Sequence, residues 1–177
     1  MDLTHGQQVA QYRVVERLQR HPLGPVYRAE PLARHDGLAM HVLHDALASD
    51  EKVSARFAEL APFIPDVRHP NIVPAIEFGQ VYGMDYAVRP LVLGPSGHWT
   101  RLDQQMAGFP DGRIPVERVR RWAIQLTRFL EHAHANRMLH HFLSPNSIVV
   151  TDTGDLQVMD HGLGHVVGDD WLRRLVG

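Results

Sequence analysis

The sequence predicts an α+β fold in which an antiparallel sheet comes first and a largely helical part follows. Residues 12–18 alternate apolar and polar side chains with the two-residue period of a strand, and turn residues lead into a second strand at 24–29. Apolar residues recur at helical spacing between 115 and 134. Residues 148–159 have the pattern of a strand, a turn and a strand.

The first half contains further expected elements. A short apolar strand at 38–43 completes a group of three antiparallel strands. Ser49 is a good helix cap, and Asp50 and Glu51 suit the positive end of the helix that follows. Pro62 ends or bends this helix. Two more strands are expected near 72–78 and 85–91.

The second half begins with a connector. Turn residues at 94–97 and 110–112 enclose an irregular stretch with a brief helix near 102–106. Pro115 suits the first position of a helix that continues to about His134. We therefore expect two parts, residues 1–93 and residues 94–177.

Bulk composition excludes several classes of function. The 177 residues, 44% of them hydrophobic, can bury one sizeable core. A net charge of -2 gives no field that would attract nucleic acid or an anionic membrane. The absence of cysteine excludes disulfides and thiolate chemistry. With no leader peptide and no long apolar stretch, we expect a cytoplasmic protein.

The 13 histidines include three close pairs, at 41 and 44, at 132 and 134, and at 140 and 141. A zinc site needs further ligands at suitable spacing, and none of these pairs has them. We expect packing or surface histidines rather than a metal site.

Four segments in the same order resemble the motifs of eukaryotic-type serine/threonine protein kinases, which bacteria also have. Arg68 to Val73 is similar to the segment after the C-helix. Residues 132–140 are similar to the approach to the catalytic loop, 140–148 to the loop itself, and 160–163 to the metal-binding loop. The resemblance implies a kinase-like fold, with an N-terminal sheet lobe carrying a C-helix at 1–93 and an incomplete helical C-lobe at 94–177.

The resemblance implies a degenerate nucleotide site. Of the three glycines that let backbone amides approach the phosphates, only Gly24 matches, since Gln19 and His21 stand at the other positions. His41 stands where a lysine contacts the phosphates, and Leu60 where a glutamate pairs with that lysine.

The catalytic loop departs further from the family. Phe142 stands in place of the aspartate that accepts the substrate's proton, and Ser144 in place of the loop lysine. Ser147 replaces the asparagine that binds magnesium. Asp160 matches a magnesium ligand, either as a weak ligand or as a turn-forming aspartate.

Residues 88–92 match the hinge that contacts adenine. Arg89 stands at the gatekeeper position and Leu91 within the hinge. The arginine side chain either fills the adenine pocket or extends to solvent along its aliphatic stem.

Three hypotheses follow. The leading one is a pseudokinase that acts as a binding or regulatory module, without a required cofactor. The alternative is a kinase homologue with weak Mg-ATP binding or atypical phosphotransfer, and the third is a decayed reading frame. For lack of the family's later helices, we expect exposed apolar residues on the 115–134 helix and a protein partner or self-association there. The candidates are Val119, Trp122, Leu126, Phe129 and Leu130.

Overall fold

The computed structural model describes residues 2–34, 36–60, 62, 68–168 and 171, with the side chain of Leu60 excepted. It divides into two compact units. The first comprises residues 1–67, 74–91 and 166–177, and the second comprises residues 68–73 and 92–165.

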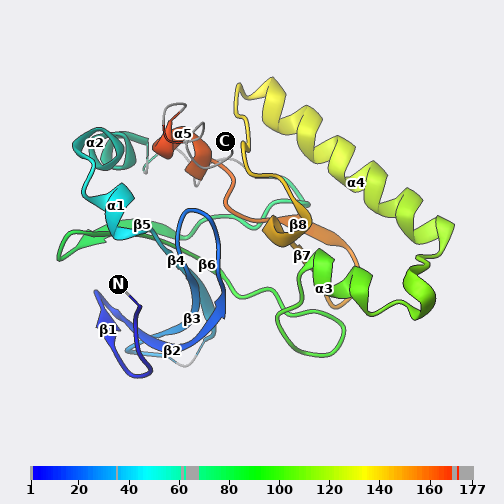
Figure 1. The fold of residues 1–177 in the computed structure, drawn as a ribbon, viewed down its shortest axis with the longest axis horizontal. Coiled ribbons are helices and arrows are strands. Elements are labelled where there is room, and N and C mark those ends of the chain that lie inside the picture. The colour runs from blue at the N-terminus through cyan, green and yellow to red at the C-terminus, as the bar shows by residue number, and fades with distance from the viewer. Residues whose placement is uncertain (1, 35, 61, 63–67, 169–170, 172–177) are drawn as a thin grey trace. The chain divides into compact units, whose positions relative to one another are not determined.

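A six-stranded antiparallel sheet forms the body of the first unit (Figure 1). Its strand order is β1-β2-β3-β4-β6-β5, so that only β5 and β6 exchange places relative to the chain order. The strands are β1 Gln8–Val9, β2 Tyr12–Gln19, β3 Val26–Pro31, β4 Leu38–Val42, β5 Glu77–Val81 and β6 Met84–Pro90.

One face of this sheet carries the main apolar core. Tyr27, Met40 and Val88 lie across from one another on β3, β4 and β6, and all three are buried. The N-terminal segment covers this face, because Leu3 belongs to the same cluster and its N–H donates to the Tyr27 hydroxyl at 2.9 Å. Each large apolar side chain buried in this way stabilises the unit by about 1.5–3 kcal/mol.

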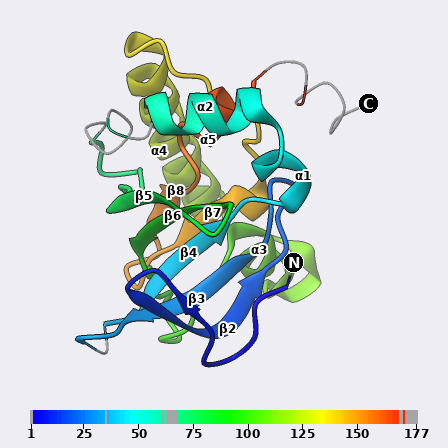
Figure 2. The same cartoon turned by 90° about the vertical axis from the view of Figure 1, so that its left-hand side faces the viewer.

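Two helices, α1 (Asp45–Ala48) and α2 (Glu51–Leu60), follow β4 (Figure 2). The cap of α2 differs from the prediction. Ser49 ends α1, whereas the Asp50 carboxylate accepts hydrogen bonds from the N–H groups of Lys52 and Val53. Both residue types are good caps, so sequence preference alone does not choose between neighbours.

The strand expected at 72–78 is wrong for most of its length. Ile72 makes only an isolated bridge with Val158, and β5 begins at Glu77. The N–H of Val73 donates to the carbonyl of Val158, and Asn71 donates through its side chain to the carbonyl of Leu156. These hydrogen bonds hold residues 68–73 against the second unit's own hairpin.

The second unit contains three helical segments before its hairpin. They are α3 Leu102–Ala107, the 3₁₀ turn Pro110–Gly112 and the long helix α4 Val116–Ala135. Pro115 caps α4 from outside and is not its first helical residue. A second 3₁₀ turn, Pro145–Ser147, leads into the hairpin of β7 Ile148–Val150 and β8 Leu156–Val158, and α5 follows at Leu163–Val167.

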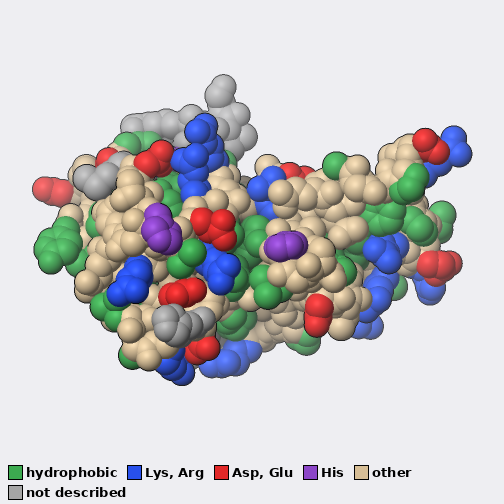
Figure 3. All heavy atoms as spheres, turned by 90° about the horizontal axis from the view of Figure 1, so that it is seen from below, with side chains coloured by type: hydrophobic (Ala, Val, Ile, Leu, Met, Phe, Trp, Pro, Cys, Tyr) green, Lys and Arg blue, Asp and Glu red, His purple; other side chains and the backbone are tan. Residues whose placement is uncertain are grey.

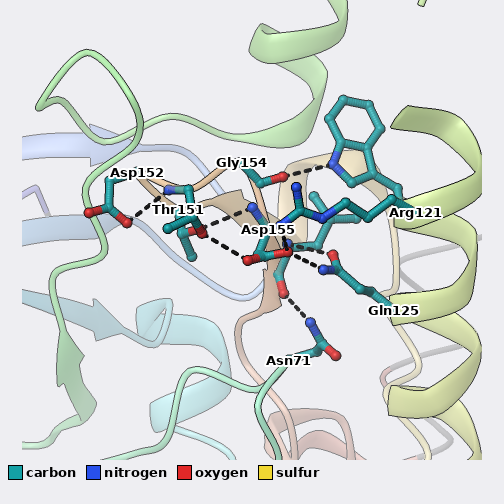
Figure 4. Close-up of polar contacts among 10 residues, drawn as sticks. Asn71, Arg121, Gln125, Thr151, Asp152, Gly154 and Asp155 are labelled. Carbon is teal, nitrogen blue, oxygen red and sulfur yellow. Dashed lines mark hydrogen bonds and ion pairs between the residues drawn. The ribbon is translucent and has the colours of Figure 1, made fainter. Parts of the chain in front are cut away.

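Polar side chains attach α4 to the turn between β7 and β8 (Figure 4). The guanidinium of Arg121 lies 2.6 Å from the Asp155 carboxylate, and the Gln125 amide donates to the same carboxylate. Trp122 donates through its indole N–H to the carbonyl of Gly154 at 3.0 Å. This contact buries the indole, which is only 5% exposed.

The apolar surface expected on the long helix is therefore only partly exposed. Trp122 and Phe129 are buried within the second unit, so they were wrongly expected on the surface. Val119 is 47% exposed, and Leu126 and Leu130 are half-buried.

Charged side chains of both signs are interspersed on the face shown in Figure 3. Within the described ranges, no helix combines the length and apolar character needed to cross a membrane.

Candidate functional site

The loop between β2 and β3 is packed against the end of β4. The N–H of His44 donates to the carbonyl of Leu23, and the N–H of Val42 donates to the carbonyl of Pro25. Gly24 has a φ of +141°, and a Cβ placed on it would lie 2.0 Å from the carbonyl oxygen of Val42. Only glycine allows this approach, so Gly24 is required here for packing.

The amides of this loop are already occupied. Between residues 22 and 25 only Leu23 and Gly24 have an N–H, since Pro22 and Pro25 have none. The Leu23 N–H donates to Nδ1 of His21 at 3.2 Å, and the Gly24 N–H donates to the His21 carbonyl at 2.9 Å. A phosphate group would have to displace these hydrogen bonds to reach the amides.

Two buried imidazoles meet at this loop, that of His21 from the loop itself and that of His41 from β4. His41 is 1% exposed and His21 is 6% exposed. Their ring centroids are 4.9 Å apart with an interplanar angle of 84°, an edge-to-face contact. His21 therefore both supports the loop and packs against the residue at the family's lysine position.

The structure buries Arg89 in the first unit at 3% exposure. Its guanidinium carbon lies 5.8 Å from the centroid of the Phe78 ring, and Phe78 packs edge-on against Phe57 of α2. The side chain thus does not extend into solvent. Leu91 is half-buried and lies close to Gly37, where an added Cβ would be 2.9 Å from the leucine methyl.

A buried carboxyl on the same sheet had no signal in the sequence. Asp85 is fully buried, and its Oδ1 accepts a hydrogen bond from Gln80, which also donates to Ser54 of α2. Within the described residues, Oδ2 of Asp85 has no hydrogen-bond partner. Burial raises the pKa of Asp85, and the Gln80 hydrogen bond opposes this shift.

In the second unit, Ser147 holds the catalytic-loop segment together. Its hydroxyl lies 3.1 Å from the carbonyl of Phe142 and 3.0 Å from both the carbonyl and the N–H of Ser144. Ser147 is fully buried, so this hydroxyl serves the loop's backbone. Ser144 caps the 3₁₀ turn from the preceding position, and the Phe142 side chain is half-buried.

The segment at Asp160 forms a sharp turn. Asp160 has a φ of +58° and Gly162 a φ of +89°, and the N–H of Leu163 donates to the Asp160 carbonyl. The Asp160 side chain is 4% exposed. His161, which follows it, is buried with its ring 5.7 Å from that of Phe129. Nε2 of His140 donates a hydrogen bond to the Met159 carbonyl at 2.6 Å, so both histidines pack inside this unit.

A contact that the sequence did not reveal joins the turn after Asp160 to the catalytic loop. Nε2 of His165 accepts a hydrogen bond from the N–H of Leu139 at 2.9 Å, and its ring lies 5.2 Å from that of His141. Gly164 has no side chain there, and an added Cβ would lie 2.6 Å from His141.

In each of the three histidine pairs, one member is more buried than the other. His41 is buried and His44 exposed, His140 is buried and His141 exposed, and His132 is half-buried while His134 is exposed. His132 packs instead beside His69, with ring centroids 5.1 Å apart. Burial lowers the pKa of His69, and the charges of His132 and Arg128 lower it further.

Two predicted positions lie outside the described residues. They are the side chain of Leu60, at the family's C-helix glutamate position, and residues 175–177, which resemble the stretch before the end of the family's activation segment.

Comparison with known proteins identifies the class of domain. No family model matches the chain. It is 30% identical over 166 residues to the DNA damage-responsive serine/threonine-protein kinase RqkA of Deinococcus radiodurans, covering 92% of this chain and 24% of that protein. It is 25% identical over 167 residues to the serine/threonine-protein kinase PknD of Mycobacterium tuberculosis, covering 94% and 24%. The chain thus spans about a quarter of the length of these relatives.

Solved structures give the same fold. The kinase domain of Mycobacterium tuberculosis PknI superimposes with a TM-score of 0.75 at 25% identity, covering 93% of this chain and 64% of that one. A double mutant of that domain gives a TM-score of 0.80 at 24% identity, covering 92% and 65%. The chain has a protein kinase-like fold and is similar over more than nine-tenths of its length to bacterial serine/threonine-protein kinases, as its motifs predicted.

The residues present fit Mg-ATP poorly. The amides available to phosphate donate to His21, and the position of the phosphate-binding lysine carries the buried imidazole of His41. The hydroxyl of Ser147, at the second metal-ligand position, is engaged with the loop backbone. Magnesium prefers carboxylates together with substrate phosphates, and these positions supply one carboxylate, Asp160.

Proposed function

We propose that this kinase-like domain does not transfer phosphate and acts as a binding or regulatory module. The observation that carries the proposal is Phe142, a half-buried phenyl ring at the position of the family's proton-accepting aspartate. A phenyl ring can neither orient a hydroxyl group nor accept its proton.

The first unit supports this proposal independently. His21 takes both amide donors of residues 22–25, and Gly24 packs against Val42. Restoring a phosphate cradle would require this loop to detach from β4 and His21 to leave its contact with His41. Replaced positions occur in both units, and one compensating group could not repair them all. They are Gln19, His21, His41 and Leu60 in the first unit and Phe142, Ser144 and Ser147 in the second.

A binding module needs a contact surface, and we propose that α4 supplies it. An apolar stripe runs along this helix, because successive members lie three or four residues apart. It consists of Val116, Val119, Ala123, Leu126 and Leu130. Val116 is 78% exposed and Val119 is 47% exposed. A second copy of the chain is the simplest partner for such a stripe, since two-fold symmetry lets one stripe pack on another.

A phosphotransfer assay tests the loss of activity. We expect the purified chain, with labelled ATP, magnesium or manganese and generic protein substrates, to incorporate no more label than its Phe142→Ala variant. Phe142→Asp alone should remain inactive, because His41 and Ser147 are still in place. Incorporation by the unaltered chain that is lost in Asp160→Ala would instead establish an atypical phosphotransferase.

A further inference from the structure

A hollow of about 240 Å³ opens at the hairpin end of the first unit. Its walls come from the N-terminal segment, from the β2–β3 hairpin and from the residues after β4. They are Asp2, Arg17, Arg20, His21, Pro25 and His44. All six belong to one compact unit.

Basic groups dominate this lining. Two guanidinium groups and two imidazoles face a single carboxylate, that of Asp2, which lies 3.0 Å from Arg17. The side chains of Arg20 and His44 are exposed, and within the part of the chain that the structure describes they take part in no hydrogen bond or salt bridge. Their donors remain available to a ligand.

The hollow is separate from the face that carries the degenerate nucleotide positions. Arg17 lies across from Tyr27, whose side chain is in the core on one face of the sheet. His41 lies across from Val26, the residue next to Tyr27, and therefore points to the other face. Only His21 is shared, since it lines the hollow and also packs against His41.

The walls are held in place before any ligand arrives. The hairpin is bonded to the residues after β4 through Leu23 and His44, and Gly24 packs directly on Val42. Arg20 and His44 therefore project from a fixed backbone, which reduces the entropy lost when a ligand binds.

We propose that this hollow binds a phosphomonoester group, such as the phosphate of a phosphorylated serine. Arginine forks match phosphate oxygens in bidentate geometry, and a phosphate dianion competes with the Asp2 carboxylate better than another carboxylate would. Pockets for drug-sized ligands measure about 300–1,000 Å³. The smaller hollow suits one phosphoryl group and the first atoms attached to it, rather than a whole nucleotide.

Calorimetric titration of the full chain at low salt tests this proposal. The probes are a short phosphoserine peptide, its unphosphorylated and glutamate versions, inorganic phosphate and ATP. We expect the phosphoserine peptide to bind at least tenfold more tightly than the other two peptides. If the phosphoserine peptide binds more tightly than inorganic phosphate, the peptide around the phosphate contributes to binding. If the two bind equally, the site recognises the phosphate group itself. ATP should bind no more tightly than inorganic phosphate.

Variants that replace single ionisable side chains with neutral amides locate the binding site. Arg20→Gln, combined with His44→Gln, should weaken phosphoserine binding at least tenfold, whereas Asp2→Asn should strengthen it by removing the competing carboxylate. Arg34→Gln is the control, because Arg34 is an exposed arginine of the same unit outside the hollow. Equal weakening by Arg20→Gln and Arg34→Gln, or no discrimination between phosphoserine and serine peptides, would overturn the proposal. Either result would leave the proposed lack of phosphotransfer untouched.

Discussion

The imidazole of His21 meets that of His41 edge to face, with ring centroids 4.9 Å apart. The same His21 accepts the N–H groups of Leu23 and Gly24, through its ring and its carbonyl respectively. His21 thus acts at two positions of the family's nucleotide site. It packs against the residue in place of the phosphate-binding lysine, and it accepts the hydrogen bonds of the loop amides. A single substitution at His41 would not restore nucleotide binding, because His21 would still occupy the loop's donors.

Mg-ATP is therefore expected to leave the melting temperature unchanged at millimolar concentration. A ligand present at 100 times its dissociation constant would add about 2.7 kcal/mol to the free energy of unfolding. Differential scanning fluorimetry with magnesium alone as the control measures this. A clear rise that needs both magnesium and ATP would contradict the expectation, and its loss in Asp160→Ala would identify the metal ligand.

Gly24→Ala should lower the free energy of unfolding by at least about 2 kcal/mol. The added methyl would lie 2.0 Å from the Val42 carbonyl oxygen, at a φ of +141° that side chains rarely adopt. Gly6→Ala is the matched control in the same unit, since Gly6 has a φ of +81° but no atom within 4 Å of the added carbon. Its cost should be about 1 kcal/mol. Urea denaturation measures the free energy of unfolding of both variants. If Gly24→Ala and Gly6→Ala lose similar amounts, the loop does not pack on β4.

Asp85→Asn should gain stability relative to the unaltered chain as the pH rises from 4 to 7. Burial raises the pKa of Asp85 above its ordinary value of 3.8, so the folded state binds its proton more tightly than the unfolded state does. Its contribution to stability is full at low pH and is lost as the pH rises through the raised pKa. Asparagine does not ionise and avoids that loss.

Asp103→Asn provides a control of opposite sign. Hydrogen bonds from Arg101, at 2.8 and 2.7 Å, hold the pKa of Asp103 below its ordinary value. Its contribution to stability is present above that ordinary value and lost toward acid. The Asp103 variant should therefore lose stability relative to the unaltered chain as the pH rises. Urea denaturation at several pH values measures both slopes, and slopes of the same sign would contradict the assignment for Asp85.

The fold could be predicted because the sequence patterns that indicate it lie within short segments and follow one another in the order of the kinase motifs. Alternation in residues 12–18 and helical spacing in 116–135 are properties of the chain itself, and the kinase motifs fix their order. The errors came from choices that depend on distant partners. Ile72 forms an isolated bridge with Val158 and does not belong to a continuous strand. Trp122 is buried where its indole N–H donates to the carbonyl of Gly154.

The residue types at the candidate site can be read from the sequence, but their conformations cannot. Motif alignment places a phenylalanine at position 142 and a histidine at position 41 without any structure. The alignment cannot show that Leu23 and Gly24 donate to His21, since that depends on the path of the loop. Nor could it choose between a buried and an extended Arg89, because a long side chain allows both.

Val119 and Ile124 offer a direct test of the proposed contact surface on α4. They are exposed to similar extents, 47% and 42%, on the same helix. Five residues of α-helix rotate the chain by about 500°, so the two side chains point about 140° apart. Val119 belongs to the apolar stripe, whereas Ile124 lies among charged residues that include Arg120 and Arg128.

Val119→Asp should therefore shift the chain toward the monomer, and Ile124→Asp should not. The substitution places a carboxylate within the stripe, where a second copy would have to desolvate it at a cost of several kcal/mol. Light scattering at several protein concentrations measures the mass, and thermal unfolding of both variants verifies that each remains folded. A strictly monomeric unaltered chain at high concentration would exclude self-association through α4. An equal effect of both substitutions would place the contact elsewhere, because a contact confined to the stripe leaves the Ile124 face in solvent.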